Sequence, residues 1–270
     1  MKKPIIHLYA NCWNDEPMLG FFFDHYDGLV DKYIFFDDGS TDRTLEILQA
    51  HPKTEIHKLP QVDQNSYILA AQNTHNNAWK ASRGQADWVF VSAVDEFLYH
   101  PQMLAYLHSC DRQGITAMPA LGYQMMSDTF PAPGLRLTDE IKNGAPWRNM
   151  NKLVVFNPDA IDQTNYSKGR HSANPEGKVA YPDTDQVLNL HYKYLSFDFI
   201  EQRHLALNQK LRAYDKDKSW GHKYSWDKQR LIEDWQGFKN RLVYEVTSNN
   251  AAKHHEHSAI SERWWRKVDL

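Results

Sequence analysis

The first part of the chain alternates short apolar runs with helical patterns, and this alternation constrains the fold more than any other feature. Apolar runs predict strands at residues 4–11, 32–37, 55–58 and 87–94, and the segments between them predict helices at 17–28, 41–51 and 66–84. Such alternation predicts an α/β fold with a mostly parallel mixed sheet flanked by helices. Ligands of these sheets bind beyond the carboxyl ends of the strands.

The pattern changes after Cys110. Further strands are predicted at 115–119, 152–156 and 187–191, between irregular stretches, and helices at 197–213, 227–240 and 260–267. We therefore expect a main domain at residues 1–195 and a helical C-terminal extension at 196–270.

The charge balance argues against nucleic acid as a partner, and the apolar runs argue against a membrane-spanning segment. Lys and Arg number 31 against 34 for Asp and Glu, a formal charge of −3, so no broad basic surface is available for nucleic acid. The apolar runs fall short of the roughly 20 residues of a membrane span, and the N-terminus lacks the apolar core of a signal peptide. Two isolated cysteines suit a reducing compartment, so a cytoplasmic location is expected.

Two pairs of carboxylates follow predicted strands. Asp37 and Asp38 precede a Gly-Ser-Thr turn, where a carboxylate can accept hydrogen bonds from a base or from ribose hydroxyls. The alternative is a plain Asp-Gly turn before a capped helix. Asp95 and Glu96 end the most apolar strand and repel each other, which indicates a cation or a catalytic role. The alternative there is an acidic helix N-terminus.

The chain resembles a known family in several motifs taken together. They are Asn14-Asp15-Glu16, His25-Tyr26, the run from Asp37 to Asp42, Asp87-Trp88, the run from Val94 to Leu98, the run from Lys152 to Pro158, Gly169-Arg170-His171, Leu190-His191-Tyr192 and a Ser-led helix with Arg203. These motifs resemble the family 2 glycosyltransferases of GT-A fold, in the bacterial branch that builds surface polysaccharides.

The resemblance implies a Rossmann-like GT-A domain with the donor site mainly in residues 4–113 and an acceptor and metal part in 114–195. It further implies inverting transfer of a sugar from a nucleotide-diphosphate donor such as a UDP-sugar. The acceptor would be a glycan or a lipid-linked sugar of capsule, O-antigen or lipooligosaccharide, reached in the cytoplasm or at the inner face of the plasma membrane.

Residue roles carry over onto matching positions. Asn14, Glu16, Asp37 and Asp38 fall where the family holds the nucleoside. Asp95 falls on the second carboxylate of an Asp-x-Asp metal motif whose first position is Ala93 here. A divalent cation, Mn²⁺ or Mg²⁺, is still expected, because the diphosphate charge must be neutralised as the donor bond breaks.

Several further residues are candidates for roles in that chemistry. The general base of an inverting enzyme is expected at Glu140 or Asp139, upstream of His171, with Glu96 a further catalytic carboxylate and Asp128 and Glu176 as alternatives. Simple solvation of Glu140 and Asp139 is the competing interpretation. His171 and His191 compete as metal ligands, and Lys152, Arg148 or Arg170 could contact the diphosphate.

The C-terminus carries two further features. The His-rich segment 253–257 resembles a metal cluster but is typical of a solvated tail, and Trp264 and Trp265 could rest on a membrane or pack on the domain. Two other functions remain as alternatives: a non-catalytic nucleotide- or glycan-binding protein, and a sugar-1-phosphate nucleotidyltransferase.

Overall fold

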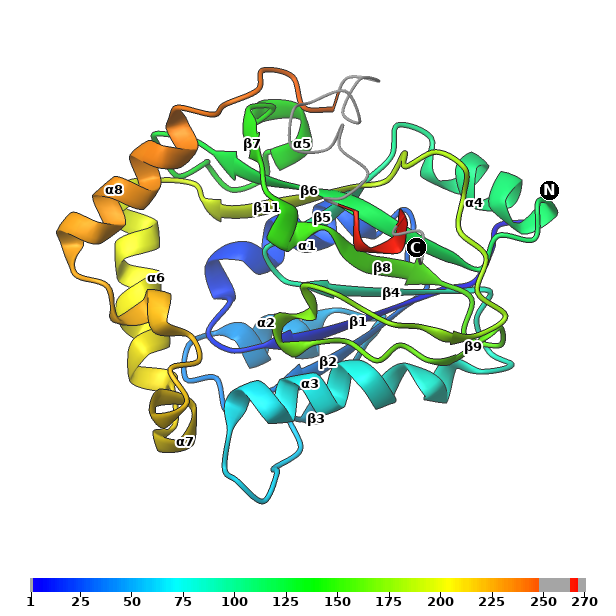
Figure 1. Ribbon diagram of the computed structural model, residues 1–270, viewed down its shortest axis with the longest axis horizontal. Coiled ribbons are helices and arrows are strands. Elements are labelled where there is room, and N and C mark those ends of the chain that lie inside the picture. The colour runs from blue at the N-terminus through cyan, green and yellow to red at the C-terminus, as the bar shows by residue number, and fades with distance from the viewer. Residues whose placement is uncertain (1, 248–262, 267–270) are drawn as a thin grey trace.

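The computed structural model describes residues 2–247 and 263–266 and has one large sheet at its centre (Figure 1). The sheet has nine strands in the order β3-β2-β1-β4-β8-β6-β11-β5, with β7 paired to β6. The strands are β1 (Ile6–Cys12), β2 (Lys32–Asp37), β3 (Thr54–Lys58), β4 (Trp88–Ala93), β5 (Glu96–Tyr99), β6 (Ala117–Met126), β7 (Gly144–Pro146), β8 (Lys152–Phe156) and β11 (Leu188–Tyr194). A separate pair is formed by β9 (Ile161–Gln163) and β10 (Glu176–Gly177).

Parallel pairing joins the first half of the sheet. Strands β3, β2, β1 and β4 are parallel neighbours, as are β6 and β11. Strand β8 is antiparallel to both β4 and β6, and β5 and β7 are antiparallel to their neighbours. The predicted α/β class with a mixed sheet is confirmed.

Helices cover both faces of this sheet. They are α1 (Glu16–Tyr26), α2 (Thr44–Ala50), α3 (Tyr67–Asn77), α4 (Met103–Arg112), α5 (Leu137–Glu140), α6 (Phe197–Lys210), α7 (Ala213–Asp217) and α8 (Lys228–Lys239). On β1, Ile6 and Leu8 face a core shared with α1, α2 and α4. Tyr9 faces the opposite core, and its hydroxyl hydrogen-bonds the hydroxyl of Ser82 at 2.7 Å. Ser82 is the last residue of the 3₁₀ turn that follows α3.

Several local predictions differ from the structure. Residues 96–99 form strand β5, so the helix N-terminus alternative for Asp95 and Glu96 is wrong. The helix predicted at 66–84 ends at Asn77 and continues as a 3₁₀ turn over Ala78–Ser82. Of the helix predicted at 260–267, residues 263–266 are described, and Trp264–Arg266 form a 3₁₀ turn.

The C-terminal helices lie where the parallel strands end. Figure 1 shows α6 and α8, in yellow and orange, at the left end of the sheet, opposite the N-terminus. Helix α6 begins at Ser196, whose hydroxyl accepts from the Phe199 N–H at 3.1 Å. Trp235 and Phe238 of α8 are buried against Tyr194 of β11. No helix within residues 2–247 and 263–266 has the length and apolar character to span a membrane.

Residues 263–266 pack on the main domain. The indole N–H of Trp265 donates to buried Asp185 at 2.8 Å, and that of Trp264 donates to the Asn151 carbonyl at 2.8 Å. Arg263 and Arg266 form ion pairs with the same Asp185 carboxylate, each at 2.8 Å. These contacts hold both indoles against the protein, which is the packing alternative of the two interpretations.

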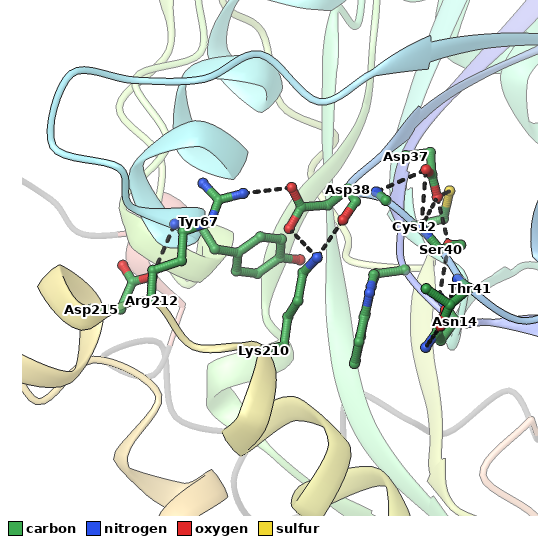
Figure 2. A network of polar contacts seen from close by, with 12 residues as sticks. Cys12, Asn14, Asp37, Asp38, Ser40, Thr41, Tyr67, Lys210, Arg212 and Asp215 are labelled. Atoms are coloured by element: carbon green, nitrogen blue, oxygen red, sulfur yellow. Dashed lines mark hydrogen bonds and ion pairs between the residues drawn. The ribbon is translucent and has the colours of Figure 1, made fainter.

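A long-range cap fixes the start of α3. The fully buried carboxylate of Asp215, on α7, accepts from the Ser66 hydroxyl and from the backbone N–H of Tyr67 at 2.9 Å (Figure 2). Helices leave their first N–H groups without intrahelical partners, so this carboxylate satisfies a buried helix end.

Replacement of this cap should destabilise the protein. We expect Asp215→Ala to lower the free energy of unfolding by about 1–3 kcal/mol, because a hydroxyl and an amide lose a buried partner. Urea denaturation measures the change, and Asp217→Ala on the exposed side of the same helix is the control. Equal stability of the two variants would show that the cap contributes nothing.

Candidate active site

A cavity of about 420 Å³ opens at the carboxyl ends of β1 and β4. Residues of the main domain and residues between 203 and 224 of the C-terminal extension line it, so the extension forms one wall of the cavity. Its lining includes Asn11, Trp13, Asp15, Ile68, Ala71, His75, Ala93, Asp95, Glu96, Lys152, Arg170, His171, His191, Lys193, Arg203, Lys210 and Lys223.

Asp95 and His191 form a polar pair at the edge of this cavity. The Asp95 Oδ2 atom lies 3.4 Å from His191 Nε2, and the Asp95 side chain is 25% exposed. The amide N of Gln124 donates to two backbone carbonyls, so its oxygen accepts from His191 Nδ1 at 2.6 Å. His191 Nε2 is thereby turned toward the Asp95 carboxylate.

The Asp95 carboxyl is ionised at neutral pH. Burial alone would raise its pKa, but His191 and Lys193 outweigh burial and lower the pKa to about 2. An ionised carboxylate beside an oriented imidazole is a ready pair of ligands for a cation.

Glu96 points away from Asp95 into a buried ionic cluster. Its two carboxylate oxygens lie 2.5 Å from Lys152 Nζ and 2.7 Å from an Arg170 nitrogen, and all three side chains are at most 4% exposed. Burial would raise the Glu96 pKa, but Arg170 and Lys152 hold it well below its usual value. Glu96 is thus a counter-charge rather than a proton acceptor, and Lys152 is bound to it rather than open to a diphosphate.

The backbone before His171 brings Arg170 into this cluster. Gly169 and Arg170 both have positive φ, 68° and 59°. The left-handed conformation is strained for Arg170, and its guanidinium gains the Glu96 ion pair and a bond to the Val91 carbonyl at 2.8 Å. His171 lines the cavity but its Nδ1 donates to the Asn149 carbonyl at 2.6 Å, away from Asp95. The geometry therefore favours His191 over His171 as the partner of Asp95.

Three of the residues predicted to hold a nucleoside accept hydrogen bonds from the loop between β2 and α2. Asp37 accepts from the Gly39 N–H at 2.8 Å and the Ser40 hydroxyl at 2.5 Å, and Asn14 accepts from the Thr41 N–H at 2.7 Å (Figure 2). Glu16 likewise accepts from the Arg43 N–H at 3.0 Å. None of Asn14, Glu16 and Asp37 lines the cavity. The turn of the alternative interpretation is present, but α2 begins at Thr44 without a side-chain cap, and the nucleoside role of these residues stays a prediction.

Asp38 is paired with the end of α6. Its carboxylate lies 2.9 Å from Lys210 Nζ and 2.6 Å from an Arg212 nitrogen, and Figure 2 shows both cations turned toward it. Lys210 also lies over the Trp13 ring, 4.9 Å from its centre, and lines the cavity. The sequence signal for this contact was only a pair of cations at the end of a predicted helix.

A second tie joins α6 to the loop after β1. One Arg203 nitrogen donates to the carbonyls of Trp13 and Asn14, and the other lies 2.5 Å from the Asp15 carboxylate. Burial raises the Asp15 pKa to about 6, although Arg203 opposes the rise. Asp15 and Arg203 both belong to motifs that resemble the family, but the sequence predicts no role for either.

The predicted base candidates lie apart from Asp95. Glu140, at the end of α5, lines a second cavity of about 270 Å³ together with Asp128, which pairs with Lys239 at 2.5 Å. Asp139 lines neither cavity, and Glu176 is an exposed residue of β10. The structure thus does not bring Glu140 or Asp139 to the edge where Asp95 lies.

Among the side chains that line the described cavity, Asp95 and His191 form a pair that could hold a metal. Within the described part of the chain, no three His, Cys, Asp or Glu side chains come together as a metal site. Mg²⁺ and similar ions take one or two protein carboxylates and complete their shell with water and substrate phosphates, so two ligands fit such a cation. The His-rich segment 253–257 lies outside the described residues.

Comparison with known proteins gives the family. The model of glycosyltransferase family 92 matches residues 18–253, which is most of the chain. The chain belongs to glycosyltransferase family 92. The predicted class of enzyme, a glycosyltransferase, is confirmed. The family differs from the expected one, because the motifs resembled family 2 and the matching model is that of family 92. No curated protein matches the chain significantly.

Solved glycosyltransferases show a low similarity to this family 92 enzyme. TarS 1–349 from S. aureus has 10% identity and a TM-score of 0.36, over 74% of this chain and 65% of that one. Its complex with UDP gives 9% identity and 0.38 over the same shares. Glucosyl-3-phosphoglycerate synthase from Mycobacterium tuberculosis, in complex with Mn²⁺, UDP and phosphoglyceric acid, gives 22% and 0.31 over 44% and 43%. The chain spans less than two thirds of these structures.

Proposed function

We propose that this glycosyltransferase takes its sugar from a nucleoside-diphosphate donor bound in the 420 Å³ cavity, with the diphosphate beside Asp95 and His191. The proposal rests on which of the cavity carboxylates already have a cationic side chain as partner. Of the three that line the described cavity, Asp15 is paired with Arg203, and Glu96 with Lys152 and Arg170. Within residues 2–247 and 263–266, the Asp95 carboxylate pairs with the His191 imidazole and with no Lys or Arg, so it is the carboxylate left for a cation and a substrate.

Asp95 Oδ2 and His191 Nε2 would hold the divalent cation. When bound, that ion supplies positive charge against the departing diphosphate. Lys193, Lys210 and Lys223 line the same cavity and add charge that favours an anionic donor. Gln124 accepts from the Nδ1–H of His191, so the neutral imidazole presents the lone pair of Nε2 to the site.

We further propose that transfer inverts the anomeric centre in a single displacement. Double displacement needs a carboxylate nucleophile, and the one uncommitted carboxylate of the described cavity is assigned to the cation. The anomeric proton coupling of the product, measured by NMR, tests this course. We propose as acceptor a glycan or lipid-linked sugar of a bacterial surface polysaccharide, handled in the cytoplasm, since the motifs resemble that branch.

A thermal-shift panel tests the donor proposal. UDP-, GDP- and dTDP-sugars are each added with and without Mn²⁺. A ligand that binds only the folded state stabilises it by about 2.7 kcal/mol at a hundred times its Kd, so at least one donor should raise the melting temperature, most strongly with Mn²⁺. No shift with any member of the panel would contradict the proposal. The family assignment favours transfer over the non-catalytic and nucleotidyltransferase alternatives.

A further inference from the structure

Asn11 has a buried amide with no partner in the protein. It is the residue before the end of β1, it lines the cavity, and both polar atoms of its amide are buried without a hydrogen bond. A buried amide without partners costs stability, because it has lost its bonds to water and gained none. Native structures keep such groups where a ligand satisfies them or where they serve another role.

Asn11 shares its side of the sheet with Ala93 and with helix α3. Ala93 pairs with Asn11 in the parallel register of β1 and β4, so both side chains point to the face covered by α3. Helix α3 contributes Ile68, Ala71 and His75 to the lining. Burial, together with Arg170 and Lys152, holds the pKa of His75 well below its usual value, so its imidazole is neutral.

The chemistry of an amide selects the kind of group it can bind here. Its oxygen accepts a hydrogen bond and its nitrogen donates one. A phosphate can only accept and a cation can only bind the oxygen, so either would leave half of the amide unpaired. A hydroxyl group, or the polar edge of a nucleobase, satisfies both atoms.

We propose that Asn11 binds an uncharged group of the donor substrate that offers both a hydrogen-bond donor and an acceptor. This proposal rests on the proposed donor site. Two parts of a nucleotide sugar have this chemistry, the hydroxyls of the transferred sugar and the nucleoside. In both cases Asn11 is a binding residue whose amide completes its hydrogen bonds only when the donor is present.

The variant Asn11→Leu separates this role from a structural one. Leu has nearly the shape of Asn, so removing an unpaired amide should leave the melting temperature of the free enzyme unchanged or raise it. Affinity for the best donor of the panel should fall about 10-fold or more, measured by calorimetry. The variant Asn11→Asp, which keeps the shape but replaces the donor group by a charge, should lose affinity similarly.

Asn76→Leu is the matched control. This amide on α3 lies outside the cavity lining, and its oxygen accepts from the Thr164 hydroxyl at 3.0 Å and the Tyr166 N–H at 2.7 Å. Its loss should lower the melting temperature and leave donor affinity unchanged, the opposite of the result expected for Asn11.

Titration with UDP, or with the free nucleotide of whichever donor binds best, identifies the group that Asn11 contacts. Loss of affinity for the sugar nucleotide but not for the free nucleotide assigns the contact to the sugar, and equal loss for both assigns it to the nucleoside. Unchanged affinity of Asn11→Leu and Asn11→Asp, with a wild type that binds, overturns the inference. A wild type that binds no nucleotide sugar overturns the proposed function and this inference with it.

Discussion

Asp95→Asn is expected to abolish sugar transfer while the fold is retained. The substitution removes the charge of the one cavity carboxylate that has no Arg or Lys partner and changes its volume very little. Loss of a preorganised charge at a site where the leaving group becomes more negative costs about 10²–10³-fold in kcat. Steady-state kinetics with Mn²⁺ present measures the effect, and the melting temperature shows that the variant is folded.

Asp139→Asn is the control for this substitution. It makes the same chemical change on α5, at a residue that lines neither described cavity, and transfer should continue at the wild-type rate. A kcat of Asp95→Asn close to that of the wild type would remove Asp95 from the reaction.

Glu96→Gln should cause the largest loss of stability. It leaves Lys152 and Arg170 buried together without their shared counter-charge. Breaking a buried ion pair from one side typically costs about 3–5 kcal/mol, because the remaining charge is neither solvated nor paired. Chemical denaturation of the variant and the wild type measures the difference in the free energy of unfolding.

Lys152→Met provides the matched comparison. It leaves Glu96 and Arg170 as a neutral pair, whereas Glu96→Gln leaves two like charges, so Lys152→Met should be the milder change. The Glu96 pKa is lowered in the folded state, so its stabilising effect is present above about pH 4.5, its usual value, and is lost as the pH falls below it. Glu96→Gln should therefore flatten the acid side of the stability profile. Equal losses in both variants would contradict this account of the cluster.

The sequence predicted the strands well where apolar runs stand between clear turns. Strands 32–37 and 152–156 have the predicted bounds, because their apolar residues fill both faces of a buried strand. The strand predicted at 115–119 is longer, and β6 runs from Ala117 to Met126 through Gly122 and Gln124. Polar and glycine residues in a fully buried strand hid its true length, and a partner far along the chain decides it.

The candidate site was predictable only in part. A carboxylate after the most apolar strand pointed to Asp95, but adjacent carboxylates look alike in a sequence, and only the structure shows Glu96 turned into a buried cluster. The pairing of Asp38 with Lys210 and Arg212 joins segments far apart in the chain, and no local pattern records it. Asn11 gave no signal, because its significance lies in the partners that it lacks.

The most direct test of the central claim is the position of a bound Mn²⁺ and donor nucleotide. Paramagnetic Mn²⁺ broadens the amide signals of nearby residues in NMR spectra of the isotope-labelled enzyme. With the donor nucleotide present, the distance-dependent broadening should place the ion nearer to Ala93, Asp95 and His191 than to Glu140 and Lys239 of the second cavity. Broadening centred on the second cavity, or equal broadening in Asp95→Asn, would contradict the assignment of the donor site to the carboxyl ends of β1 and β4.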